Sequence, residues 1–221
     1  KVVYAWFDNS EKTPFSRGQH ISDAPDSLDV ISMMYPAELA AFELVDMQTV
    51  HAKGTKVVYT ISLDKIQKEY TEKVKEGTAT GSFDTYLKSE MDKQIGYAGS
   101  FDGMITEYKG NNPIYMSAEQ KAEAKKYQDI FFSAVLTWKT ANADKLLTFQ
   151  GYPENLIEQT ILTNCKHIIL ATDNVTDDAQ LSVFARLAMA AAGVPTDRFV
   201  VAVSTASLDA SDKQTGFYGT D

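Results

Sequence analysis

Residues 100–110 read SFDGMITEYKG, a short stretch rich in apolar and β-branched residues. Such a stretch is typical of a buried strand. Six comparable stretches occupy residues 2–7, 30–34, 56–61, 145–149, 167–171 and 198–203, and residues 101–108 complete a set of seven strand candidates. All seven are nearly continuous in apolar character, as parallel strands that are buried on both faces require. The sequence therefore predicts a parallel sheet.

Longer amphipathic segments lie between the strand candidates and predict helices. They cover residues 36–52, 83–97, 117–142, 155–163 and 177–192. The clearest of them begins with Ser117 and carries Gln120 three residues later, which is the spacing of a capping box. Strands and helices that alternate along the whole chain predict one α/β domain, residues 1–221, with a sheet that is doubly wound or closed into a barrel.

Two features favour the barrel. The first strand candidate is followed by Asp8 and Asn9 rather than by a glycine-rich loop, which counts against a dinucleotide-binding fold. Seven strand candidates in series suit a (β/α)8 TIM barrel. Only a polar segment, residues 204–221, follows the last candidate. We therefore expect an incomplete barrel that lacks the eighth strand and helix.

Composition restricts the classes of partner. The 221 residues carry a formal net charge of −9, and the isoelectric point is near 4.9. Nucleic-acid-binding proteins carry clustered lysine and arginine, so this charge argues against a nucleic acid as ligand and against docking on an anionic membrane. A neutral partner such as a glycan is compatible with it. No stretch approaches the ~20 apolar residues that a transmembrane helix needs.

Neither a disulfide nor a metal site is expected. Cys165 is the single cysteine, so no disulfide can form within the chain, and we expect it to be a buried thiol at the start of a strand. The three histidines, His20, His51 and His167, are scattered and show no zinc-binding spacing. No cofactor is predicted.

Aromatic residues occur where four of the strand candidates end. They are Trp6, Tyr35, Tyr108 and Tyr152. In a barrel the functional residues sit at the carboxyl ends of the strands. Each ring alone could pack on the rim of the barrel, but four together favour sugar recognition, since flat rings stack on the C–H faces of a pyranose and nearby amides and carboxylates bind its hydroxyls.

The stretch quoted above resembles the signature of glycoside hydrolase family 18, in which Phe-Asp-Gly leads into D-G-x-D-x-D-x-E. The opening Tyr4-Ala5-Trp6 and residues 25–32 (PDSLDVIS) are similar to the first two strands of that family. They particularly resemble the branch that contains endo-β-N-acetylglucosaminidases and the surface glycan-binding relatives of glycan-foraging bacteria. The resemblance covers strands one to seven and implies a barrel that recognises N-acetylglucosamine-containing oligosaccharides or the glycans of glycoproteins.

The departures from the signature concern its carboxylates. Counted from Asp102, the later acidic positions fall on Ile105, Glu107 and Lys109. In the family the last of these protonates the leaving oxygen and the middle one helps to hold the acetamido group. Alternate residues share one face of a strand, so a slip of two residues places Glu107 in the acid position but leaves Ile105 as its partner. No register supplies the Asp and Glu pair, and a protonated lysine is a poor acid.

Three hypotheses follow. The leading one is a glycan-binding protein without hydrolytic activity. Its predicted contacts are Trp6, Tyr35, Glu107, Tyr108, Gln150, Tyr152 and Asp173. The alternative is an active endo-β-N-acetylglucosaminidase or chitinase-like hydrolase that uses Glu107 as acid, with Asp102 or Asp173 beside it. The third is a scaffold protein without a sugar site, in which Glu107 and Lys109 form a structural ion pair at the barrel mouth.

The two ends of the chain and the resemblance lead to further expectations. Lys1 opens directly onto the first strand candidate without a signal peptide, as in a mature or trimmed chain. The resemblance implies an extracytoplasmic location, at a bacterial cell surface or in the periplasm, with other glycan-uptake proteins as partners. Family members bring a sugar-stacking aromatic on the eighth strand, and the segment expected to approach its place is Gly216-Phe217-Tyr218-Gly219.

Overall fold

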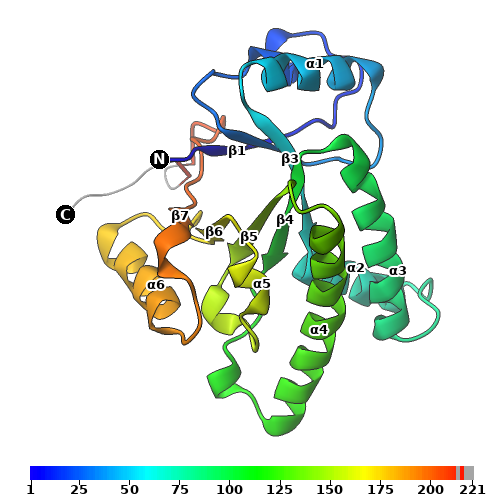
Figure 1. Ribbon diagram of the computed structural model, residues 1–221, viewed down its shortest axis with the longest axis vertical. Helices are drawn as coiled ribbons and strands as arrows, with labels where there is room; N and C mark the ends of the chain where they lie inside the picture. Colours follow the sequence, from blue (N-terminus) through cyan, green and yellow to red (C-terminus); the bar gives the residue numbers. More distant parts are fainter. Residues whose placement is uncertain (213–214, 217–221) are drawn as a thin grey trace.

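The computed structural model describes residues 1–212, 215 and 216 and contains one parallel sheet whose seven strands follow chain order. The strands are β1 (Tyr4–Phe7), β2 (Val30–Met33), β3 (Lys56–Ser62), β4 (Gly103–Tyr108), β5 (Leu146–Gly151), β6 (His167–Leu170) and β7 (Phe199–Val201). The helices lie around the outer side of the sheet (Figure 1). This is a half-barrel of the incomplete (β/α)8 type, which confirms the predicted fold class. The expected aromatic segment, Phe217 to Gly219, lies outside the described residues.

Six α-helices connect the strands. They are α1 (Ala41–Ala52), α2 (Leu63–Lys75), α3 (Phe83–Ile95), α4 (Ala118–Ala141), α5 (Thr160–Thr163) and α6 (Asp178–Ala190). The capping box predicted at Ser117 and Gln120 is present at the start of α4. Helix α2 was not predicted, because only Leu63 and Ile66 are buried on a helix whose other residues are mostly charged, which leaves a narrow apolar stripe. In the part of the chain described here, no helix is both long and apolar enough to cross a membrane.

Two predicted helices are shorter than expected. Helix α1 begins at Ala41 rather than at residue 36, since the backbone at Ala40 is still extended. The segment predicted as a helix over 155–163 is helical only in α5. The residues before it are held by the preceding βα unit instead. The Asn155 amide donates to the carbonyl oxygens of Lys109 and Gly110, and the Ile157 N–H donates to Gln128.

The two faces of the strands bury different cores. The larger core lies between the sheet and the helices and includes Met104 of β4, Phe149 of β5 and Phe131 of α4. A smaller cluster fills the inside of the half-barrel, formed by Val30, Val58, Ile105, Ile169 and Ala202. Burying one such aliphatic or aromatic side chain stabilises a fold by roughly 1.5–3 kcal/mol. The inner cluster is small, so polar side chains occupy the rest of the inner face.

Glycines allow the closest strand contacts around β4. A Cβ atom on Gly103 would lie 1.9 Å from the carbonyl oxygen of Leu146, so no other residue fits there without a backbone shift. Gly151 at the end of β5 has a φ of +139° and would place a Cβ 1.8 Å from the Tyr108 carbonyl oxygen. The Asp-Gly pair of the quoted stretch therefore has a packing role as well as a place in the signature.

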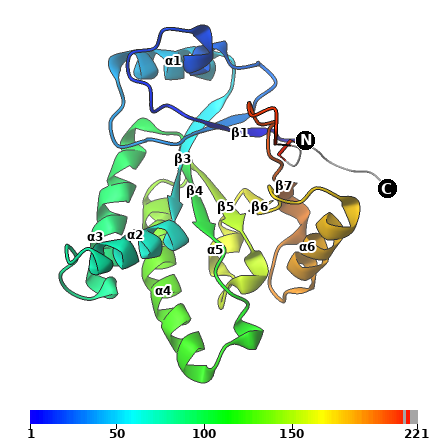
Figure 2. The same ribbon diagram turned by 180° about the vertical axis from the view of Figure 1, so that it is seen from behind.

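Among the residues that the structure describes, the strands at the two ends of the sheet, β1 and β7, each pair with one neighbour. The start of the chain and the segment that follows β7 lie side by side in both views (Figure 2). Residues of both edges line one cleft at this opening, including Val3 and Trp6 on β1 and its approach and Val201 and Val203 on the other side. The opening between the edges therefore leads into the inside of the half-barrel.

Candidate functional site

A cleft of about 640 Å3 opens at the carboxyl ends of the strands, and four predicted site residues line it. Trp6 of β1, Glu107 of β4, Gln150 of β5 and Asp173 after β6 come together there. The register explains the meeting of the central pair, because Glu107 lies beside Gln150 in the parallel ladder. The cleft lies at the end of a barrel-type sheet where ligands bind.

Half-buried polar groups in the cleft have no partner within the described chain. The side chains of Glu107 and Asp173 make no hydrogen bond or ion pair with any described residue. The Oε1 atom of Gln150 is shielded from water and likewise lacks a hydrogen-bond donor. A buried acceptor without a donor costs roughly 1–3 kcal/mol. Such groups are available to the hydroxyl and amide groups of a ligand.

Trp6 forms one wall of the cleft and is 40% exposed. Its ring centroid lies 6.5 Å from that of Tyr4, whose hydroxyl reaches across the inside of the half-barrel. That hydroxyl lies 2.8 Å from Thr148 Oγ1 and 2.8 Å from His167 Nδ1. Burial raises the pKa of Tyr4 to about 12, so the phenol is neutral at physiological pH. Neutral hydrogen bonds thus hold the Tyr4 ring in place beside Trp6, which forms the wall of the cleft.

Tyr35 lies in a neighbouring hollow of about 460 Å3 rather than in the cleft itself, and it is 49% exposed. The hollow and the cleft adjoin, because both are lined by Met34, Thr60, Ser62 and Lys65. Lys65 belongs to α2, the helix that the sequence did not predict, so sequence analysis missed it. Ser62, also missed, caps that helix and is the ladder neighbour of Glu107.

The remaining two predicted residues are not brought to the cleft. Tyr108 is only 7% exposed and faces α4, where its hydroxyl accepts a hydrogen bond of 3.1 Å from Gln128 Nε2. Burial raises the pKa of this phenol. Tyr152 stacks on Phe184 of α6, with ring centroids 5.7 Å apart and an interplanar angle of 17°. Tyr108 packs β4 against α4, and Tyr152 packs the loop after β5 against α6.

The signature positions Ile105 and Glu107 lie within β4, whereas Lys109 lies just beyond its carboxyl end. Ile105 belongs to the inner apolar cluster, directly below Glu107. Lys109 lies beyond the strand, where its N–H and that of Gly110 donate to the Asp64 carboxylate at 2.6 and 3.1 Å. In the described ranges no ion pair joins Lys109 to Glu107, so the predicted structural pair does not form. Lys109, which the resemblance places at the position of the family's acid, therefore does not line the cleft.

Asp102 lies at the opposite end of β4. Its Oδ2 atom accepts the Val57 N–H at 2.7 Å and contacts His51 Nε2 at 2.6 Å, so it ties β3 and α1 to the start of β4. The alternative in which Asp102 sits beside Glu107 is wrong, because the length of the strand separates them. Asp173 is the predicted carboxylate that shares the cleft with Glu107.

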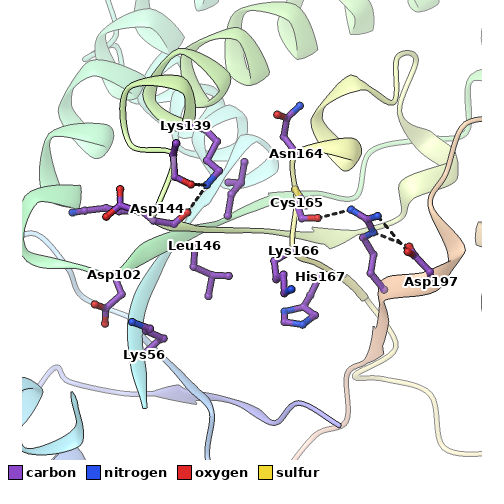
Figure 3. Close-up of a pocket in the computed structure, with 14 residues that line it drawn as sticks. Lys56, Asp102, Lys139, Asp144, Leu146, Asn164, Cys165, Lys166, His167 and Asp197 are labelled. Atoms are coloured by element: carbon purple, nitrogen blue, oxygen red, sulfur yellow. Dashed lines mark hydrogen bonds and ion pairs between the residues drawn. The ribbon is translucent and has the colours of Figure 1, made fainter. Parts of the chain in front are cut away.

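A second cavity, of about 710 Å3, lies at this opposite end, which we call the floor (Figure 3). Charged side chains around it mostly bind the backbone. Lys139 Nζ donates to the carbonyl oxygens of Ala143 and Lys145 at 2.6 Å each, and Arg198 donates to the Cys165 carbonyl at 2.9 Å while it pairs with Asp197. These charged side chains therefore hold the loops at the floor in place by binding backbone carbonyl groups.

Cys165 is buried in the wall of the floor cavity, as predicted for a thiol at the start of a strand. Its Sγ atom donates to the Ile161 carbonyl oxygen at 3.3 Å, and burial raises its pKa to about 12. A thiol that stays protonated is a weak nucleophile. Across residues 1–212, 215 and 216, no cluster of three His, Cys, Asp or Glu side chains could hold a metal ion.

Comparison with known proteins identifies the family. The family model for glycoside hydrolase family 18, BT1044-like, matches residues 1–221. The chain belongs to glycoside hydrolase family 18. No curated protein sequence matches it.

Solved structures share the fold of this family 18 chain. An apo endo-β-N-acetylglucosaminidase from Cordyceps militaris superposes with a TM-score of 0.63 at 13% identity, covering 99% of this chain and 80% of that one. A selenomethionine form of BT1044 gives 0.62 at 16% identity, over 92% and 66% of the two chains. A family 18 chitinase from Cycas revoluta in complex with (GlcNAc)3 gives 0.55 at 15% identity, over 91% and 68%. At these identities the likeness shows the fold alone.

Proposed function

We propose that this family 18 chain binds an N-acetylglucosamine-containing glycan without hydrolysing it. The glycan lies in the cleft at the carboxyl ends of the strands, which we call the mouth cleft. Trp6 supplies a flat apolar wall, and Gln150, Glu107 and Asp173 supply hydrogen-bonding groups that no described protein group satisfies. Two related folds in the comparison carry such ligands, namely (GlcNAc)3 in the Cycas revoluta chitinase and fucosyl-N-acetylglucosamine-Asn in the Cordyceps militaris enzyme. A neutral glycan is also consistent with the charge of −9.

The observation that carries the proposal is the pair of side chains at Ile105 and Glu107. Both side chains lie on the face of β4 that points into the half-barrel, but the residue below Glu107 is an isoleucine in the inner apolar cluster. In the register that places Glu107 in the acid position, Ile105 stands where the family has the carboxylate that holds the acetamido group of the substrate, and an isoleucine cannot hold or polarise that group. The cleft thus keeps a binding wall and polar contacts while the paired carboxylates are missing from its central strand.

One observation favours the alternative, an active hydrolase. Glu107 and Asp173 line the same cleft, so two carboxylates are present even though they come from β4 and the loop after β6. General acid catalysis contributes roughly 10²- to 10⁴-fold to a rate. A hydrolase of this kind would lose its activity in both Glu107→Gln and Asp173→Asn.

The test measures binding and hydrolysis on the same preparation. Isothermal titration calorimetry with chitotriose and with a free N-glycan reports binding, and mass spectrometry of an N-glycosylated protein after incubation reports glycan release. Binding without release is the expected result. We expect Trp6→Ala to weaken binding by about 2 kcal/mol, or about thirtyfold, since a buried aromatic contact is worth that much. Phe15→Ala, another exposed aromatic, is the control.

If wild-type protein releases the glycan and Glu107→Gln does not, the proposal is wrong and the chain is an active hydrolase. Failure of wild-type protein to bind either glycan would leave the scaffold hypothesis. We further propose that residues 1–221 act as a single domain outside the cytoplasm, at a bacterial surface or in the periplasm beside other glycan-uptake proteins. The family resemblance supports this location, and immunolabelling of intact cells tests it.

A further inference from the structure

The hollow that holds Tyr35 adjoins the mouth cleft and has its own polar lining. It runs between the loop after β2 and the helices α2 and α3, with Thr60, Ser62 and Gln94 among its polar groups. The exposed ring of Tyr35 forms part of its wall, as the exposed ring of Trp6 does in the cleft. The two cavities meet at Lys65, so a ligand longer than the cleft can continue into the hollow.

The charges around the hollow balance. Three lysines and three glutamates line it, namely Lys12, Lys65, Lys93, Glu38, Glu69 and Glu90. A lining of this kind gives no net attraction to a strongly charged ligand. An exposed aromatic ring together with hydroxyl and amide groups suits an uncharged sugar chain.

A buried side chain fixes the backbone of Tyr35. Asn9 is only 3% exposed, and its amide bonds both backbone groups of Tyr35. Its Oδ1 accepts the Tyr35 N–H at 2.7 Å, and its Nδ2 donates to the Tyr35 carbonyl oxygen at 2.9 Å. The loops after β1 and β2 are thereby joined where neither strand continues.

A buried carboxylate in turn holds Asn9. Glu43 of α1 is 2% exposed, and every group that contacts its two oxygens is a donor. These donors are Asn9 Nδ2 at 2.7 Å, Lys12 Nζ at 3.0 and 2.9 Å, and the Ala40 N–H at 2.6 Å. Burying a carboxylate is costly unless it is fully paired. The groups that pair with this carboxylate lie at the wall of the hollow, since Lys12 and Tyr35 both line it.

We propose that the hollow is a second subsite that receives the continuation of the sugar chain bound in the cleft, and that Asn9 and Glu43 are positioning residues that hold Tyr35 against it. The inference rests on the proposed function and adds to it the class of ligand, an uncharged oligosaccharide long enough to occupy both cavities. Tyr35 contacts the distal sugars, whereas Asn9 and Glu43 act through Tyr35 without touching the ligand.

The experiment compares chitobiose with chitohexaose by calorimetry on the full chain. We expect wild-type protein to bind the hexamer at least about tenfold more tightly, because the hexamer alone reaches Tyr35. Tyr35→Ala should remove this advantage and leave the affinity for the dimer unchanged. Glu43→Gln should act in the same direction, since one of its atoms becomes an NH2 group facing donors. The double variant should be no worse than Tyr35→Ala, because both changes act on one contact.

Controls separate this role from stability. Tyr115→Ala removes an exposed tyrosine outside both cavities and should change neither affinity. If Glu43→Gln does not fold, Lys12→Met breaks the ion pair at its half-buried end and tests the same network. Equal affinity of the two oligomers for wild-type protein would overturn the second subsite while the cleft stands. Loss of both affinities in Glu43→Gln would overturn the positioning role. No binding of either oligomer by wild-type protein would instead contradict the proposed function.

Discussion

The mouth and the floor of the half-barrel are both hollow and both charged, yet their side chains are used differently. At the floor, Lys139, Lys145, Asp102 and Arg198 all bind backbone groups, and the last two also bind His51 and Asp197 respectively. Charged groups there that pair with no described residue are exposed to water. At the mouth, Gln150, Glu107 and Asp173 are half-buried, and their side chains pair with no described group. The charged groups of the floor cavity therefore stabilise the fold, whereas the cleft at the mouth has the unsatisfied groups that a ligand can bind.

Gly103→Ala should have the largest effect and act on stability alone. The new Cβ would meet the Leu146 backbone at 1.9 Å, and overpacking of this severity costs about 3 kcal/mol or more in unfolding free energy. Urea denaturation followed by circular dichroism measures it. Gly18→Ala is the control, because no atom lies within 4 Å of its Cβ position. Equal midpoints for the two variants would show that β4 and β5 do not approach so closely.

Asp102→Ala should come next. It leaves the Val57 N–H and His51 without their acceptor, which costs roughly 1–3 kcal/mol in unfolding free energy, while glycan affinity stays at the wild-type value. Asp144→Ala, at an exposed position on the same cavity whose side chain pairs with no described residue, should stay within about 0.5 kcal/mol of wild type. Glycan binding that falls with Asp102→Ala in fully folded protein would contradict the division of roles between floor and mouth.

A pair of glutamines sharpens the comparison. Gln150→Leu removes a buried oxygen that has no donor, so we expect unfolding free energy to rise by up to about 1 kcal/mol while glycan affinity falls about tenfold. Gln128→Leu removes bonds to Tyr108 and to the Ile157 N–H and should lower unfolding free energy instead. Denaturation measures the unfolding free energy of both variants, and calorimetry measures their glycan affinity. A loss of stability in Gln150→Leu would mean that its amide has a structural role.

The smallest effect should come from pH. Burial, and after it the charge of Lys166, lower the pKa of His167 in the folded chain. The unfolded chain then takes up this proton first, near the ordinary histidine pKa of about 6.5, so His167 lowers stability as pH falls below that value and has no such effect above it. His167→Gln should flatten this part of the stability profile between pH 7 and pH 5. An unchanged slope would assign the acid sensitivity to other groups.

Much of the fold was predictable from the sequence. Strands buried on both faces are apolar along their length, so residues 101–108 and their six counterparts stand out from the chain. The alternation of side chains along a strand also places Glu107 on the inner face, with Ile105 below it. The same rule puts Tyr108 on the outer face, where the structure has it, although its position at a strand end had suggested a role in the site.

Only the tertiary structure decided which strand ends share a cavity. Loops after strands have no periodicity, so nothing in the sequence separates Tyr35 from the cleft of Trp6 or turns Tyr152 toward α6. Asn9 and Glu43 lie 34 residues apart, and their contact depends on how α1 packs over the first two strands. Sequence fixes what each local segment can become, because backbone periodicity is local, whereas the site depends on contacts between segments that only packing brings together.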